Sequence, residues 1–198
     1  MIITIDGYSC QGKSYIGRTL SNTLELEFLS TGKIVRYVAY QYTKIQDRET
    51  KTEHLLDKAV EIMKNTSIPD ILKCEYLDTR ITEQTLRIVA EYPYVFDSVV
   101  EVIIDYASNR NIVLDGRFTF NIFPNAHRCY YFLSSIERRA SLVSRSKNIS
   151  HEEALDYIQF RDSFEKKYII PDYVKKVNMD SYPSADVLVQ YLKNDVLS

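Results

Sequence analysis

One eight-residue segment near the N-terminus constrains the fold of this chain more than any other feature. It reads Gly7-Tyr8-Ser9-Cys10-Gln11-Gly12-Lys13-Ser14 and fits the pattern G-x-x-x-x-G-K-[ST] at every fixed position. Residues 2–6 before it are a short apolar run typical of a buried strand, and residues 14–26 after it carry apolar side chains at helical spacing. This order of strand, loop and helix predicts a phosphate-binding loop in an α/β fold.

The residue types in the segment suit the binding of a polyphosphate. Gly7 and Gly12 permit the dihedral angles that turn backbone N–H groups inward, and the following helix adds the partial positive charge of its N-terminus. Lys13 is expected to reach the β- and γ-phosphates and the Ser14 hydroxyl to ligate Mg²⁺. The segment therefore predicts ATP and Mg²⁺ as ligands. The Cys10 thiol is a candidate nucleophile, but the residue lies in the middle of the loop, where its backbone contributes more to phosphate binding than its side chain does.

A second strand is expected to end beside this loop. Residues 112–115 form an apolar run that ends in Asp115, followed by Gly116 and Arg117. An acidic residue at the end of a neighbouring strand supports the Mg²⁺ shell in folds of this kind, although many strands end in Asp because a turn follows. Arg117 would project into the same cleft, at the carboxyl ends of the strands.

Strands and helices alternate along the rest of the chain, which indicates a parallel sheet covered on both faces. Capping boxes are expected at two helix starts, Ser134 with Glu137 and Ser150 with Glu153. The expected strands cover residues 2–6, 111–115, 129–133 and 173–178. The expected helices cover residues 14–26, 31–42, 54–64, 82–92 and 93–107 and one segment from residue 184, with a loop at 43–53 and a turn at 65–70.

The composition excludes several other classes of protein. The formal net charge of −2 gives no strong field toward nucleic acid or an anionic membrane, so basic clusters such as Arg138 and Arg139 are local anion-handling groups or solvated faces. The three cysteines form no C-x-x-C pair, which argues against a disulfide framework or zinc site. The apolar N-terminal run is too short for a signal peptide. We expect a cytoplasmic protein whose partners are small molecules, without nucleic acid or membrane.

Several motifs together resemble bacterial cytidylate kinase across nearly the whole chain. Residues 3–14 resemble that family's first strand and P-loop, and residues 30–36 its L-D-T-G-x-x-x-R segment. Residues 114–117, with Phe-Pro-Asn-Ala at 123–126, resemble its D-G-R-D and F-P-D-A stretch. Residues 131–139 resemble the next strand and helix, and residues 161–165 fall where the family has R-D-x-x-D in its lid.

The resemblance implies a fold and an activity. The family phosphorylates CMP and dCMP with ATP and Mg²⁺, on a nucleoside-monophosphate-kinase-like three-layer α/β sandwich with a five-stranded parallel sheet. The implied organisation is a single P-loop kinase domain over residues 1–198. Its helical acceptor-binding insert would cover about residues 37–95, and a short lid about residues 147–170.

The resemblance also implies site residues. Arg36 and Arg117 would hold the acceptor phosphate, which suits a guanidinium because it binds phosphate oxygens bidentately. Arg80 lies near a substrate arginine of the family, and Arg161 would be a lid arginine that completes the site. The implied catalytic residues are Lys13, Arg117 and Arg161. The implied acceptor-binding residues are Ser30, Arg36, Arg80, Arg117, Phe118 and Glu165, and the implied metal-binding residues are Ser14 and Asp115.

Four positions depart from the family pattern, all on the acceptor side or in the lid. Phe118 replaces a carboxylate implicated in recognition of the cytosine, and Ser30 replaces the Asp of L-D-T-G. Glu165 replaces a lid Asp, and Tyr168 replaces a lid Arg. Losing a carboxylate that accepts hydrogen bonds can change specificity by orders of magnitude. The donor side is therefore retained, whereas the acceptor side has changed.

Three functions stay open at this point. The first is a kinase for CMP or a related pyrimidine nucleotide, and the second is a kinase of the same descent for a modified nucleotide or another metabolite. The third is a nucleotide-binding module without catalysis. A phosphate acceptor needs no general base, whereas a hydroxyl acceptor would direct attention to Asp6 or Asp115. The sequence leaves open whether the protein is a monomer or a homodimer.

Overall fold

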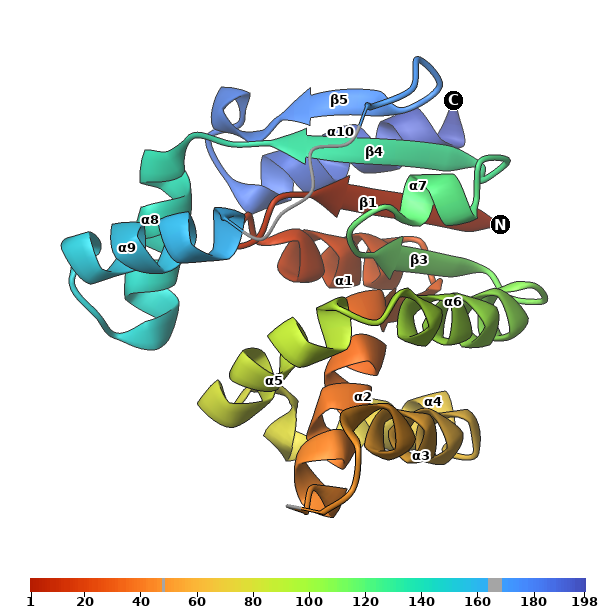
Figure 1. The fold of residues 1–198 in the computed structure, drawn as a ribbon. Helices are drawn as coiled ribbons and strands as arrows, with labels where there is room; N and C mark the ends of the chain where they lie inside the picture. Colours follow the sequence, from red (N-terminus) through yellow and green to blue (C-terminus); the bar gives the residue numbers. More distant parts are fainter. Residues whose placement is uncertain (48, 164–168) are drawn as a thin grey trace. The chain divides into compact units, whose positions relative to one another are not determined.

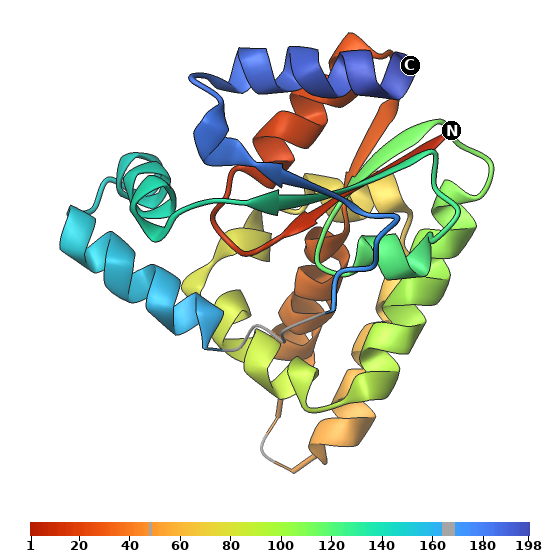
Figure 2. The same ribbon diagram turned by 90° about the horizontal axis from the view of Figure 1, so that it is seen from above.

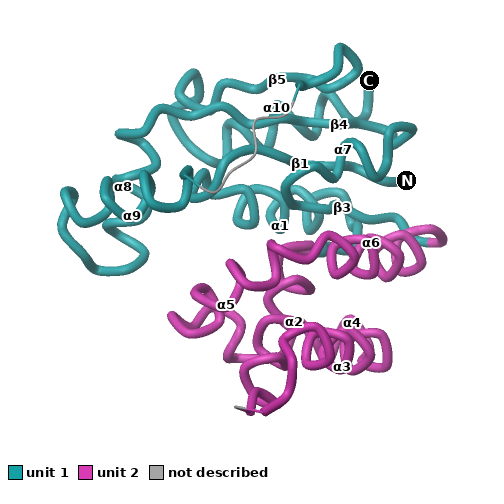
Figure 3. Tube along the Cα trace, in the orientation of Figure 1, with its two compact units in different colours: residues 1–29, 110–198 teal, residues 30–109 magenta. Residues whose placement is uncertain are grey.

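The computed structural model describes residues 1–47, 49–163 and 169–198. The chain divides into two compact units, residues 1–29 with 110–198 and residues 30–109 (Figure 3). The predicted insert at about residues 37–95 falls within the second unit, and the prediction of a single domain stays a prediction. No helix among the described residues combines the length and the apolar character that crossing a membrane requires.

A parallel β-sheet organises the first unit (Figure 1). Strand β1 pairs in parallel with β3 and β4, and β4 pairs in parallel with β5, so the carboxyl ends of these strands meet at one edge. The predicted five-stranded sheet is thus confirmed, with the order β2-β3-β1-β4-β5. The strands are β1 (Ile2–Gly7), β2 (Glu27–Ser30), β3 (Ile112–Asp115), β4 (Arg128–Leu133) and β5 (Lys175–Asn178).

Helices cover both faces of this sheet (Figure 2). On one face α1 (Lys13–Thr23) and α10 (Ala185–Leu197) pack against the strands, and on the other lies the short α7 (Thr119–Ile122). Ile16 and Leu20 lie one turn apart on α1 and are both buried, as their spacing predicts. The main core consists of Ile3, Ile5, Ile16, Leu20, Val113, Tyr130, Phe132, Val177, Met179, Leu188, Val189, Leu192 and Val196.

Two further helices of the first unit, α8 (Ile136–Lys147) and α9 (His151–Asp162), pack on each other through small and branched side chains. The capping box of Ser150 and Glu153 at the start of α9 is confirmed. The one predicted at Ser134 is wrong, because α8 begins one residue later and Ser135 accepts the capping hydrogen bond. Ser134 instead directs its hydroxyl to Asp180.

Helices joined by short loops make up most of the described part of the second unit. The helix at Pro93–Ala107 has the predicted bounds, whereas α2 extends past the predicted end and α4 occupies part of the predicted turn. Pro69 is compatible with α4 because it lies in the first helical turn, where its missing N–H costs nothing. The elements are α2 (Thr31–Ile45), α3 (Thr52–Lys64), α4 (Ile68–Lys73), η1 (Glu75–Asp78), α5 (Arg80–Ala90) and α6 (Pro93–Ala107).

A charged cluster fixes α10 to the sheet. The hydroxyl of Tyr130, which is fully buried on β4, donates to a carboxylate oxygen of Asp195 at 2.7 Å. Lys175 of β5 donates to the other oxygen, and the Nε of Arg128 lies 3.6 Å from the oxygen that Tyr130 contacts. Burial raises the pKa of Asp195, but the hydrogen bonds from Lys175 and Tyr130 outweigh it and leave the pKa below its usual value of 3.8.

We expect Asp195→Asn to lower the free energy of unfolding by about 2 kcal/mol near neutral pH, because it removes a charged acceptor from a buried hydroxyl and a lysine. The native pKa of Asp195 is the lower one, so the carboxylate contributes its full stability above the unfolded pKa. That contribution disappears as pH falls through the native pKa. Chemical denaturation of both proteins from pH 7 to pH 3 measures the difference.

Asp172→Asn is the matched control, because Asp172 is an exposed carboxylate of the same unit. Its effect on the free energy of unfolding should stay within about 0.5 kcal/mol. A difference between wild type and Asp195→Asn that grows below pH 4 would contradict the assigned pKa direction.

Candidate functional site

The chain turns sharply between β1 and α1, and the turn depends on residues in the left-handed region. Gly7, Cys10 and Gly12 have φ angles of 141°, 64° and 78°. A Cβ at Gly7 would lie 2.7 Å from the carbonyl oxygen of Phe132, so only glycine allows the loop to approach β4 this closely. Gly12 forms the N-cap of α1. The loop thus places the N-terminus of α1 directly after the carboxyl end of β1.

The lysine of the motif lies over the loop. The Lys13 ammonium donates to the carbonyl oxygens of Gly7 and Tyr8 at 2.8 and 2.5 Å. Both carbonyls are neutral acceptors, and a phosphate oxygen would be a stronger partner for the ammonium.

The two predicted metal-binding residues lie in direct contact. The hydroxyl of Ser14, at the start of α1, donates to the carboxylate of Asp115, at the end of β3. Both supply oxygen ligands, and Mg²⁺ keeps several waters and substrate oxygens, so two protein ligands fit this ion. The described residues contain no cluster of three or more His, Cys, Asp or Glu that could hold a metal ion. The pair therefore suits a magnesium ion shared with a nucleotide, and its metal role stays a prediction.

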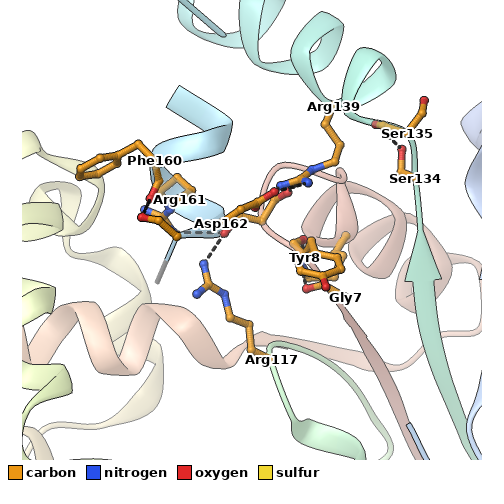
Figure 4. Close-up of polar contacts among 12 residues, drawn as sticks. Gly7, Tyr8, Arg117, Ser134, Ser135, Arg139, Phe160, Arg161 and Asp162 are labelled. Carbon is orange, nitrogen blue, oxygen red and sulfur yellow. Dashed lines mark hydrogen bonds and ion pairs between the residues drawn. The ribbon is translucent and has the colours of Figure 1, made fainter. Parts of the chain in front are cut away.

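Two of the predicted arginines converge on one hydroxyl of the loop. Arg117, which follows β3, and Arg161, in the last turn of α9, each direct a guanidinium N–H to the Ser9 hydroxyl, the latter at 3.4 Å. Ser9 itself is buried. Figure 4 shows both arginines near the end of α9. The structure therefore brings Lys13, Arg117 and Arg161 to the same loop, which concentrates positive charge there.

A third arginine, Arg139 of α8, contacts the loop and was not among the predicted site residues. Its Nε donates to the carbonyl oxygen of Ser9 at 2.9 Å, and its two terminal nitrogens donate to the carboxylate of Asp162 at 2.8 and 2.6 Å (Figure 4). The guanidinium carbon also lies 5.6 Å from the centre of the Tyr8 ring. Arg139 and Asp162 are 23 positions apart, so local sequence patterns carry no signal for this pair.

Asp6 is one of the two carboxylates considered as a general base for a hydroxyl acceptor. In the structure its oxygens accept hydrogen bonds from the start of α7. It is fully buried and accepts hydrogen bonds from the backbone N–H and hydroxyl of Thr119, both at 2.7 Å, and from the N–H of Phe120 at 2.9 Å. Burial raises the pKa of Asp6, with these hydrogen bonds acting in the opposite direction. Its function in the structure is to hold the start of α7.

Phe118 occupies the position where the resemblance places a carboxylate. Its φ of 84° lies in the left-handed region, which is strained for a bulky side chain. The ring packs edge-on against Phe120 with 5.3 Å between ring centres, next to a cluster that includes Cys129 and Val174. An apolar ring therefore follows Arg117 directly.

Two side chains inside the loop face inward. Cys10 packs against the α8–α9 core, and burial raises the pKa of its thiol despite the opposing charges of Arg161 and Arg139, which disfavours a reactive thiolate. Gln11 is 1% exposed, and both polar atoms of its amide lack a hydrogen-bond partner among the described residues. Its oxygen lies against Gly7. The amide is thus a buried polar group with a cost in stability.

The remaining predicted acceptor residues belong to the second unit or fall outside the described residues. Ser30, Arg36 and Arg80 belong to the second unit, where Arg80 is exposed at the start of α5. The guanidinium of Arg36 lies 3.5 Å from the Asp78 carboxylate and donates to the carbonyl of Gly32. Glu165, together with Lys166, Lys167 and Tyr168, lies outside the described residues. The acceptor roles of these residues stay predictions.

Comparison with known proteins gives consistent matches. The family model described as cytidylate kinase matches residues 3–175. A cytidylate kinase of Flavobacterium johnsoniae is 30% identical over 183 residues, covering 81% of this chain and 78% of that protein. One of Desulfitobacterium hafniense is 24% identical and covers 99% of this chain and 90% of that protein. An uncharacterized protein of Eubacterium ventriosum shares the fold at 13% identity with a TM-score of 0.56, covering 99% and 97% of the two chains.

We expect Gln11→Met to raise the free energy of unfolding by about 1 kcal/mol, because methionine fills a similar volume without an unpaired amide. For a chain of this size the melting temperature should rise by about 2–4 °C. Thermal denaturation without nucleotide measures the change.

Gln159→Met, at an exposed position of α9, is the control and should leave the melting temperature within about 1 °C of wild type. A lower melting temperature for Gln11→Met would show that the amide has partners in solution.

Proposed function

The chain belongs to the cytidylate kinase family and is a phosphotransferase, and from this premise we propose that it transfers the γ-phosphoryl group of ATP to a nucleoside monophosphate such as CMP or dCMP. One observation carries the proposal: Lys13, Arg117 and Arg161 converge on a loop that is shaped for a phosphate chain, beside the Ser14–Asp115 pair. Relatives of the same family, which are named cytidylate kinases, support the choice of acceptor.

The loop would bind the donor. Its backbone N–H groups and the N-terminus of α1 attract the phosphates, and the Lys13 ammonium would exchange its two carbonyl partners for phosphate oxygens. Ser14 and Asp115 would hold Mg²⁺, which neutralises charge on the phosphate oxygens when it is bound. Tyr8 and Cys10 contribute backbone rather than side-chain chemistry.

Arg117 and Arg161 would stabilise the phosphoryl group during transfer. Both now share the Ser9 hydroxyl, a weak neutral acceptor, and a phosphate with its charged oxygens would be a stronger one. Guanidinium groups placed in advance lower the barrier because little reorganisation is needed as charge spreads over the transferred group. A phosphate acceptor is already ionised and needs no base, which agrees with Asp6 being buried and fully engaged.

A second candidate function is a kinase of the same family with a different acceptor. Phe118 favours this second function, because its apolar ring cannot accept a hydrogen bond from the cytosine as a carboxylate can. Ser30 and Glu165 are further departures from the family pattern. The third possibility, a module without catalysis, is excluded by any magnesium-dependent ADP formation that requires Lys13.

We expect Lys13→Ala to reduce magnesium-dependent ADP formation at least about 100-fold, because it removes a charge placed on the transferred phosphoryl group. A coupled ADP assay with a panel of nucleoside monophosphates measures this, and brisk formation of CDP by wild type would identify CMP as acceptor.

Lys176→Ala, an exposed lysine on β5, is the control and should retain wild-type activity. Undiminished ADP formation by folded Lys13→Ala would show that the loop is not the donor site.

We expect Phe118→Asp to raise kcat/KM for CMP about tenfold or more relative to wild type, because it introduces a charged hydrogen-bond acceptor next to Arg117. Phe118→Asn is the matched control, since Asn tolerates a positive φ equally well but lacks the charge. If both variants treat CMP and the other monophosphates as wild type does, residue 118 does not contact the acceptor.

A further inference from the structure

The end of α9 is attached to the phosphate-binding loop by an ion pair between a buried arginine and a partly exposed aspartate. Arg139 is 4% exposed. Its two terminal nitrogens donate to both carboxylate oxygens of Asp162, and its Nε donates to the Ser9 carbonyl (Figure 4). One side chain thus bonds the loop and the last residue of α9 at the same time. A lysine in its place could not make these three bonds in one plane.

The residue adjacent to this attachment is one of the proposed catalytic arginines. Asp162 and Arg161 are consecutive residues at the end of α9, so fixing the first restricts where the second can stand. Arg161 directs its guanidinium to the Ser9 hydroxyl, and Arg139 holds the carbonyl of the same residue. The two arginines therefore meet the loop at one residue from two different helices.

A bidentate ion pair with a buried arginine adds little to the stability of a fold compared with apolar packing. Removing the Arg139 charge from water costs several kcal/mol, and apolar residues of similar volume often stabilise a fold as well as a buried charge or better. Apolar packing already joins α8 to α9 through Ala140, Val143, Ala154 and Ile158. What the ion pair adds is a fixed geometry between the loop and the end of α9.

We propose that Arg139 and Asp162 are positioning residues, whose ion pair sets the place of Arg161 over the phosphate-binding loop during phosphoryl transfer. The inference rests on the proposed function, because it concerns how one arginine of that reaction is placed. Neither residue needs to touch the substrate. Displacing a catalytic group by about 1 Å can reduce a rate about 100-fold, so the pair can control turnover without contributing to binding.

The test compares Asp162→Asn, Asp162→Glu and the control Asp156→Asn, an exposed carboxylate on the same helix. We expect Asp162→Asn to lower kcat about 10- to 100-fold, with KM for ATP changed less than about threefold. Asp162→Glu restores the carboxylate and should recover most of the rate, and Asp156→Asn should match wild type. Melting temperatures show which variants are folded.

A double-mutant cycle with Arg161→Ala separates positioning from a general loss of stability. If Asp162 acts through Arg161, Asp162→Asn should reduce kcat less than about twofold further once Arg161 is absent. The inference would be overturned if the reductions in kcat caused by Asp162→Asn and by Arg161→Ala multiplied in the double mutant. An unchanged kcat in folded Asp162→Asn would overturn it as well.

Hydrogen exchange of the same proteins keeps this outcome distinct from failure of the proposed function. In Asp162→Asn we expect faster exchange in both the loop at residues 7–13 and the end of α9, with Asp156→Asn unchanged. Unchanged exchange in an active Asp162→Asn enzyme removes the inference alone. A wild-type protein that transfers phosphate to none of the monophosphates removes the proposed function, and the inference with it.

Discussion

The close passage of Gly7 beside Phe132 is the constraint on which the rest of the site depends. Any side chain at that position would collide with the carbonyl oxygen of β4, and the turn that follows also needs positive φ at Gly12. Because the main chain can make this turn, α1 starts directly at the sheet edge, with Lys13 and Ser14 in its first turn. The placement of charge around the loop follows from the backbone.

The loop is surrounded by more positive than negative charge in the described part of the chain. Arg117, Arg139 and Arg161 come from three separate segments, and Asp162 is the carboxylate that pairs with Arg139. Like charges held this closely repel each other, and a bound polyphosphate would relieve that repulsion. Under the proposed function, this repulsion in the protein without nucleotide would therefore increase the affinity of the site for a polyphosphate.

Local signals in the sequence predicted a large part of this structure. The loop motif, the apolar run of β3 and the bounds of Pro93–Ala107 depend on neighbouring residues, and the structure has them. Strand β2 escaped prediction because it has four residues with polar ends, and the capping serine of α8 was misplaced by one position because two serines are adjacent. The Arg139–Asp162 pair could not be predicted, since only the packing of α8 on α9 brings it together.

Asp6 explains how the turn after Arg117 can tolerate an unusual residue. Its carboxylate, on the strand that leads into the phosphate-binding loop, holds the N–H groups of Thr119 and Phe120. Those hydrogen bonds hold the backbone directly after Phe118. The left-handed conformation at residue 118 therefore does not depend on the backbone preference of its own side chain. An aromatic ring can then replace a smaller polar side chain at a cost in strain but without loss of the turn. The residue after Arg117 can therefore change in chemistry while the arginine keeps its place, which would allow the predicted donor site to be retained while the predicted acceptor site changes.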